Sequence, residues 1–295
     1  MAPLMTATRL PPDQWFPAGW AGITTRQVTA DDVVCRVVEA GPAAGPPVVL
    51  LHGWAVSAYL WRHTLAGLAE AGYHAYAPDL PGHGLSGAPG ARGDYTLERF
   101  ATRLSGLLDA LGLERPPVVA QSMGGRIAIE LATRGRAARL ALFGAVGFGQ
   151  VMPAAAYAPF LPEFVGDLAS ALVSRRMVEI VERRVHGKLG WFTERDVDEY
   201  WAPTQFADVV RAQVQMLREF PWAPLAPAEL ASIAVETLVV VGTSDRTVRP
   251  LDTAAMVRML PRGRLEQVEG GGHVLMEEIP GRVNAMLVEF LGRAG

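Results

Sequence analysis

Short apolar runs alternate with helical stripes along most of this chain. Apolar runs bounded by turn residues predict strands at 23–28, 33–39, 48–53, 73–80, 118–121, 140–146, 237–242 and 264–270. The first two runs flank Ala30-Asp31-Asp32, which predicts a hairpin. Apolar residues at helical spacing predict helices near 57–72 and over 96–111, directly after residue 122, after residue 242 and from residue 280 onward.

Strands that alternate with helices indicate a mostly parallel sheet with right-handed crossovers and helices on both faces. Residues 147–230 break this alternation, because they carry helical patterns and end in the proline-punctuated PWAPLAPAEL. We therefore expect an α/β core formed by 1–146 and 231–295, with an N-terminal arm at 1–20. We expect 147–230 to form a helical cap inserted between two strands of the sheet.

Composition narrows the class of protein. The 295 residues are half apolar, 19% charged and carry a net charge of −3, which gives no general attraction to nucleic acid or anionic membrane. Cys35 is the only cysteine, so no intrachain disulfide can form, and its strand-like segment predicts a small buried or edge residue. The first 20 residues lack the apolar core of a secretion signal, and no apolar run is long enough to span a bilayer. We expect a cytoplasmic protein without stable membrane anchoring.

The stretch VVAQSMGG, from Val118 to Gly125, carries the most specific chemistry. An apolar strand stops at Ser122, and a helical pattern starts directly after it. Small residues on either side, Ala120 and Gly124, leave room for a tight turn that presents the hydroxyl, and Gly125 allows the helix to approach the strand. The pattern is G-x-S-x-G with alanine in the first position, and it predicts a nucleophilic serine.

A serine hydroxyl needs a base to accept its proton and an acid to orient that base. Asp245 follows the buried strand TLVVVG, and His273 lies in a glycine-rich loop after the next strand. Loops after parallel strands meet at one edge of the sheet, so these side chains can converge on Ser122. Taken singly, Asp245 is a loop-initiating aspartate and His273 a solvent-facing residue. Together with Ser122 they predict a catalytic triad, since the segment GAVGFGQ, where the strand before it ends near Val146, offers no alternative carboxylate.

Acyl transfer also requires donors for the developing oxyanion. We expect the backbone N–H groups of Trp54, after the HG dipeptide, and Met123, at the helix start, to supply them. A plain strand-ending turn is the alternative for His52-Gly53. We expect Gly53, Trp54, Met123 and Val274 to line the substrate pocket, because their sequence neighbours fix their positions.

These motifs together resemble the α/β-hydrolase-fold serine hydrolases, of the esterase and lipase kind. The segments LLHGW, DLPGHGLS, AQSMGG, VVVGTSD and GGGHVLMEEIP follow that family's order from about residue 22 to the C-terminus. The resemblance implies that Ser122, Asp245 and His273 are nucleophile, acid and base, that Trp54 and Met123 are oxyanion donors, and that His83 is structural. Haloalkane dehalogenases and epoxide hydrolases of the family carry aspartate at the position of Ser122, which disfavours both activities here.

We therefore expect a carboxylic-ester hydrolase acting on small-molecule esters with small to medium apolar acyl groups. Lactone, thioester and C–C bond hydrolysis by the same triad remain alternatives, as do perhydrolysis and a slow-turnover ligand receptor. We expect no cofactor and no metal, because no residues show ligand spacing. The polar stretch ERRVHGKLG predicts that His186 and Lys188 are solvated. Physiological substrate, acyl-chain preference, the cap residues that line the pocket and oligomeric state cannot be inferred from the sequence.

Overall fold

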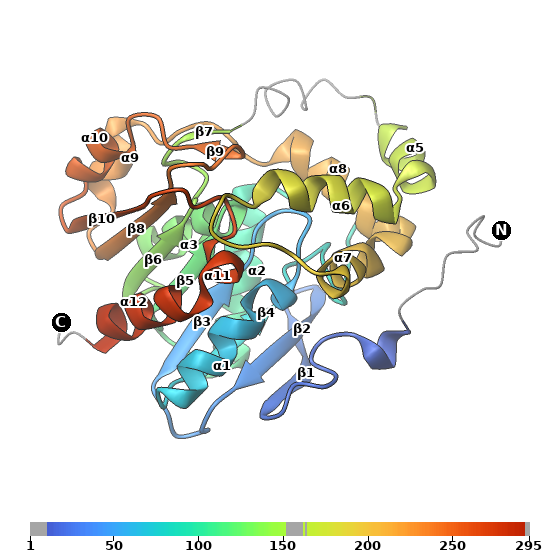
Figure 1. The fold of residues 1–295 in the computed structure, drawn as a ribbon, viewed down its shortest axis with the longest axis horizontal. Helices are drawn as coiled ribbons and strands as arrows, with labels where there is room; N and C mark the ends of the chain where they lie inside the picture. Colours follow the sequence, from blue (N-terminus) through green and yellow to red (C-terminus); the bar gives the residue numbers. More distant parts are fainter. Residues whose placement is uncertain (1–10, 152–161, 163, 293–295) are drawn as a thin grey trace.

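The computed structural model describes residues 11–151, 162 and 164–292, so residues 1–10 of the expected arm lie outside the described residues. An eight-stranded sheet runs through the centre of the molecule (Figure 1). Its strands, in spatial order, are β1 (Ile23–Ala30), β2 (Val33–Ala40), β4 (His74–Pro78), β3 (Pro47–Leu51), β5 (Val118–Gln121), β6 (Arg139–Phe143), β8 (Glu236–Gly242) and β10 (Gly263–Val268).

The pairing of these strands confirms the predicted mostly parallel sheet. From β4 to β10 all neighbours are parallel, whereas β1 pairs with β2, and β2 with β4, in antiparallel fashion. The hairpin between β1 and β2 turns at Asp31, whose φ of 55° lies in the left-handed region that aspartate tolerates. Cys35 on β2 is buried, in agreement with the sequence.

Helices cover both faces of the sheet (Figure 1), as the alternating pattern predicts. The 3₁₀ helix η2 (Ala58–Trp61), α1 (Arg62–Glu70), α11 (Leu275–Glu278) and α12 (Pro280–Gly292) pack over one apolar core. The other core lies beneath α2 (Leu97–Ala110), α3 (Met123–Thr133) and α10 (Thr253–Arg258). Thr96 begins α2 as expected, because its side chain accepts a hydrogen bond from the N–H of Arg99.

The segment between β6 and β8 is largely helical. It contains α5 (Val165–Leu172), α6 (Arg175–Val185), α7 (Glu194–Trp201), η4 (Ala202–Gln205), α8 (Ala207–Glu219) and α9 (Pro227–Ser232). A short strand, β7 (Gln150–Val151), pairs with β9 (Val248–Arg249) outside the main sheet. A short 3₁₀ helix, η1 (Pro12–Gln14), precedes the sheet. In the described part of the chain, no helix combines the length and apolarity needed to cross a membrane.

The prediction that the stretch ERRVHGKLG is solvated is wrong for one of its two named residues. Lys188 is exposed, but His186 is only 5% exposed. Helix α6 ends at Val185, and His186 follows as its C-terminal cap with extended backbone, packed 5.4 Å from the ring of Phe192. The polar neighbours of His186 hid a tertiary contact that local composition does not encode.

Candidate active site

Ser122 occupies a strained turn between β5 and α3. Its φ of 52° and ψ of −120° are unfavourable for a residue with a side chain, so the surrounding structure must hold them. The Ser122 N–H donates to the carbonyl of Phe143, and the Ser122 carbonyl accepts from the N–H groups of Gly125 and Val146. A side chain at Gly124 would collide with the carbonyl of His52 on the neighbouring segment. The turn predicted from the small flanking residues is therefore present.

Asp245 and His273 meet through a hydrogen bond. Asp245 follows β8, His273 follows β10, and the His273 Nδ1 lies 2.8 Å from the Asp245 Oδ2. The second carboxylate oxygen, Oδ1, accepts from the N–H groups of Thr247 at 2.7 Å and Val248 at 2.9 Å. Both side chains are buried, so this carboxylate is fixed at both oxygens and faces the imidazole.

Three contacts that the sequence did not reveal bring the His273 loop beside the Ser122 turn. Gln121, which precedes Ser122, donates its Nε2 to the His273 carbonyl at 3.2 Å. The His273 N–H donates to the carbonyl of Val185, at the end of α6, at 2.7 Å. A Cβ at Gly144 would lie 2.9 Å from the His273 Nδ1, so the absence of a side chain there makes room for the imidazole. The one signal of these contacts in the sequence was Gln121, the polar residue that ends the apolar run VVAQ.

The loop after β3 places Gly53 against Ser122. A Cβ at Gly53 would lie 2.9 Å from the Cβ of Ser122. The Nε2 of His52 accepts from the N–H of Leu80 at 2.9 Å, so the ring hydrogen sits on Nδ1, which donates to the Gly53 carbonyl at 2.8 Å. Because the peptide is trans and planar, fixing this carbonyl also fixes the N–H of Trp54, which points the opposite way.

His52 holds this arrangement as a neutral imidazole. Burial lowers its pKa below the ordinary value of 6.5. Burial also lowers the pKa of His83 to about 3, and the two rings meet edge to face with centroids 5.0 Å apart. Both histidines are completely buried and neutral, and this agrees with a structural role for His83. The assignment of the Trp54 and Met123 N–H groups to an oxyanion hole stays a prediction.

The expected pocket residues beside Gly53 differ in their exposure. Met123 and Val274 are buried, and the half-buried Trp54 donates its indole N–H to the carbonyl of Gln213 on α8 at 2.9 Å. Their role as pocket walls stays a prediction.

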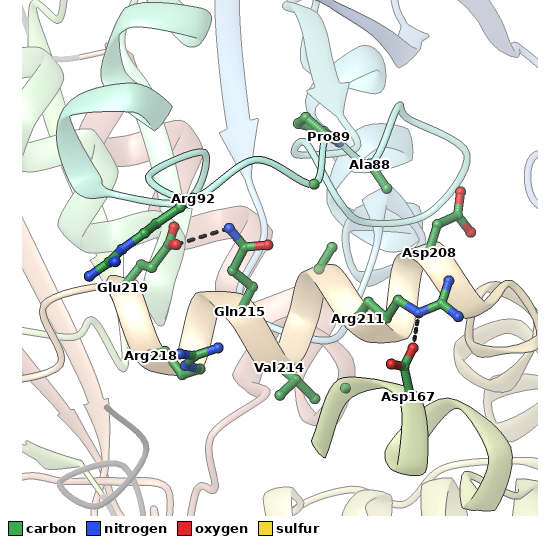
Figure 2. A pocket seen from close by; sticks show the side chains of 13 residues that line it. Ala88, Pro89, Arg92, Asp167, Asp208, Arg211, Val214, Gln215, Arg218 and Glu219 are labelled. Atoms are coloured by element: carbon green, nitrogen blue, oxygen red, sulfur yellow. Dashed lines mark hydrogen bonds and ion pairs between the residues drawn. The ribbon is translucent and has the colours of Figure 1, made fainter. Parts of the chain in front are cut away.

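A separate groove of about 610 Å³ lies between α8, α5 and the loop around Pro89. Figure 2 shows its charged lining, in which Arg211 pairs with Asp167 and Gln215 bonds Glu219. None of the predicted site residues lines this groove. We therefore do not place the reaction there.

A nucleophilic cysteine is excluded as an alternative. Cys35 is buried in β2, and burial raises the pKa of its thiol to about 11. The reactive form of cysteine is the thiolate, so this side chain is inert at neutral pH.

The fold and the serine turn define a class, and the comparisons with known proteins agree with it. The alpha/beta hydrolase family model matches residues 48–286, so the chain belongs to the alpha/beta hydrolase family. It is 31% identical to epoxide hydrolase A of Mycobacterium tuberculosis, over 91% of this chain and 97% of that protein. It is also 31% identical to the magnesium-chelatase 30 kDa subunit of Rhodobacter capsulatus, over 86% of this chain and 90% of that one.

Among solved structures, a bacterial membrane phospholipase A superposes with a TM-score of 0.74 at 27% identity, over 92% of this chain and 86% of that one. The family, the epoxide hydrolase and the phospholipase support hydrolase activity. The names of the epoxide hydrolase and of the phospholipase imply different hydrolysed bonds, so the substrate must be argued from the site.

Proposed function

We propose that this chain is a carboxylic-ester hydrolase that acts through Ser122, His273 and Asp245 and takes small-molecule esters with apolar acyl groups. The observation that carries the proposal is the Asp245–His273 hydrogen bond of 2.8 Å, in a loop tied by Gln121 to the strained Ser122 turn. A buried carboxylate fixes the imidazole tautomer, which leaves Nε2 as the proton acceptor.

The reaction proceeds by acyl transfer. The His273 Nε2 accepts the proton of the Ser122 hydroxyl while the oxygen attacks the ester carbonyl, and the N–H groups of Trp54 and Met123 stabilise the oxyanion. Collapse of the tetrahedral intermediate expels the alcohol, which receives the proton from His273. Water then gives a proton to His273 and attacks the acyl-enzyme, and the acid leaves as Ser122 regains its proton. Asp245 stays ionised throughout.

The residue at the turn favours ester hydrolysis over epoxide hydrolysis. The resemblance noted from the sequence motifs implies an aspartate nucleophile at this position in epoxide hydrolases of the family, whereas this chain carries Ser122. Serine with a histidine base suits an electrophilic carbonyl that can accept negative charge into an oxyanion hole. Lactones and thioesters share that carbonyl, so they are the nearest alternatives. We further propose that α5–α8 form a cap over the site, since α8 contacts Trp54 and the end of α6 contacts His273.

The deciding experiment combines covalent labelling with a substrate panel. An alkyl p-nitrophenyl phosphonate should label Ser122 in an intact-mass measurement, and Ser122→Ala should lose labelling and about 10⁵- to 10⁶-fold in kcat with p-nitrophenyl butyrate. Ser232→Ala, on an exposed serine of α9, is the matched control and should retain both. Unchanged ester turnover in Ser122→Ala, or turnover of styrene oxide that exceeds turnover of every p-nitrophenyl ester from acetate to palmitate, would overturn the proposal.

A further inference from the structure

A buried cluster of possible metal ligands lies where α6 meets α11. Glu182 and His186 are one turn apart at the C-terminal end of α6, and Glu277 lies on α11, which Figure 1 shows in red beneath α6. One carboxylate oxygen from each glutamate and one imidazole nitrogen lie within 4.8 Å of one another. Three possible ligand atoms, from two elements that are distant in sequence, therefore lie close enough together to share one cation.

Two oxygens of this cluster are buried without a partner. The side chains of Glu182 and Glu277 are 4% and 3% exposed. In the part of the chain that the structure describes, neither the Oε2 of Glu182 nor the Oε2 of Glu277 has a hydrogen-bond partner. Buried polar atoms in native proteins are almost always paired, so two orphaned carboxylate oxygens in one cluster indicate a missing cationic or proton-donating group.

The charges around the cluster do not balance without such a group. Arg62 pairs with Glu277 and also with Asp196 at 2.7 Å, so one guanidinium already serves two carboxylates, and in the described part of the chain it forms no ion pair with Glu182. The Tyr200 hydroxyl donates to the Oε1 of Glu277 at 2.7 Å and so leaves the Oε2 of Glu277 without a partner among the residues that the structure describes.

The donor set selects the kind of cation. Imidazole combined with carboxylates suits Zn²⁺ and Mn²⁺, whereas Ca²⁺ and Mg²⁺ prefer oxygen ligands alone. The His186 Nδ1 lies 3.7 Å from the Oε2 of Glu182 and donates to the backbone carbonyl of Glu182 at 2.9 Å, so the Nε2 is the nitrogen that keeps a lone pair for a cation. We propose that Glu182, His186 and Glu277 form a binding site for a divalent transition-metal cation, with zinc as the favoured occupant, and that it fastens α6 to α11.

This site adjoins the loop that carries His273. The carbonyl of Val185, next to His186, accepts the N–H of His273 at 2.7 Å. Glu278, next to Glu277, accepts the N–H of Gly272 at 2.8 Å and that of Gly187 at 3.0 Å. A cation that joins α6 to α11 would therefore hold both sides of the His273 loop. Its role toward the reaction is to position this loop, not to touch substrate.

The test measures binding and stability, so its outcome does not depend on the proposed ester hydrolysis. The full chain is treated with EDTA, dialysed, and titrated separately with zinc sulfate, manganese chloride and magnesium chloride. We expect one equivalent of zinc by calorimetry and a rise in Tm of about 5 °C at a zinc concentration 100 times the Kd. We expect a smaller rise with manganese, which binds such sites more weakly, and none with magnesium. The Ser122→Ala protein should bind zinc with the same affinity.

Variants in α6 separate this site from adventitious binding. Glu182→Gln and His186→Gln should each abolish the zinc-dependent rise in Tm. Glu179→Gln, on the same helix but paired at the surface with Arg183, should retain it. No rise with zinc or manganese, or an equal rise in Glu182→Gln, would overturn the proposal. A Glu182→Gln protein that is more stable than the parent, while zinc shifts neither, would also overturn it and would place a proton on Glu182.

Discussion

Replacing Asp245 by asparagine isolates the orienting role of one carboxylate. In the parent, Oδ2 accepts from the His273 Nδ1, and Oδ1 accepts from the N–H groups of Thr247 and Val248. An asparagine can keep the two backbone bonds only with its amide oxygen at the Oδ1 position. Its NH₂ group then faces the imidazole, because the reverse orientation would set this donor against two N–H donors.

This geometry gives the direction and size of the effect. An NH₂ group 2.8 Å from Nδ1 requires a lone pair on that nitrogen, so the imidazole hydrogen moves to Nε2. With Nε2 protonated, His273 cannot accept the proton of Ser122. The same exchange in a well-studied triad lowers kcat about 10⁴-fold, which corresponds to about 5 kcal/mol of transition-state stabilisation. We expect a loss of that order with p-nitrophenyl butyrate at pH 7.5 and a nearly unchanged Tm, since both backbone bonds survive.

A matched control lies seven residues after Asp245 in the sequence. Asp252→Asn removes one charge from an exposed residue at the start of α10, whose φ of 57° asparagine tolerates. This variant should keep parental kcat. If Asp245→Asn retained more than a tenth of the parental kcat while folded, the carboxylate would not set the tautomer, and the assignment of Asp245 as the orienting acid would fail.

Three further predictions test the supports of the site. Gly144→Ala places a Cβ 2.9 Å from the His273 Nδ1 at a φ of 50°, so kcat should fall about 10²-fold with a lower Tm, by steady-state kinetics and thermal unfolding. His52→Ala releases the Gly53 carbonyl, so kcat should fall about 10²- to 10³-fold while KM changes little; an unchanged kcat would contradict this role. Burial tends to raise the pKa of Asp79, but Arg36 and hydrogen bonds lower this pKa below the ordinary value of 3.8. The ionised Asp79 carboxylate therefore stabilises the folded state above about pH 4, and this stabilisation is lost as the pH falls further and Asp79 takes up a proton. Asp79→Asn should therefore lower the free energy of unfolding by about 3–5 kcal/mol at pH 7, and urea titrations should show the difference shrinking below about pH 4.

The sheet and the serine turn were predictable because their determinants are local. An apolar run such as Val48–Leu51 can only be a buried strand or part of a buried helix, and its length and β-branching favour the strand. The Ser122 turn is likewise encoded by its small neighbours. The positions of Asp245 and His273 could be predicted because each residue follows the end of a predicted strand. Each of these features depends on fewer than about ten consecutive residues, so a single sequence is enough to predict it.

The contacts that position His273 could not be predicted, because the residues that make them are distant from His273 in the sequence. Gln121 and the carbonyl of Val185 act on His273 only after β5 and α6 have been placed against its loop. His186 shows the same difficulty, since its polar neighbours Arg184 and Lys188 suggest solvent. Helical phase was the overlooked signal: Glu182 and His186 are four residues apart and so share one face of α6, and that face turned out to be buried.

The glycine-rich loop before His273 explains why these long-range contacts with His273 matter. Three consecutive glycines, 270–272, have little conformational preference of their own, so the position of the imidazole must come from contacts around them. Those contacts come from the inserted segment and α11: the Lys188 N–H donates to the carbonyl of Gly270, and Glu278 accepts the N–H of Gly272. A side chain at Gly187 would collide with backbone atoms of the same loop, so the segment around Gly187 and the glycine loop pack backbone against backbone. Exchanging the inserted helices for those of a relative should therefore alter the geometry of His273 as well as substrate choice.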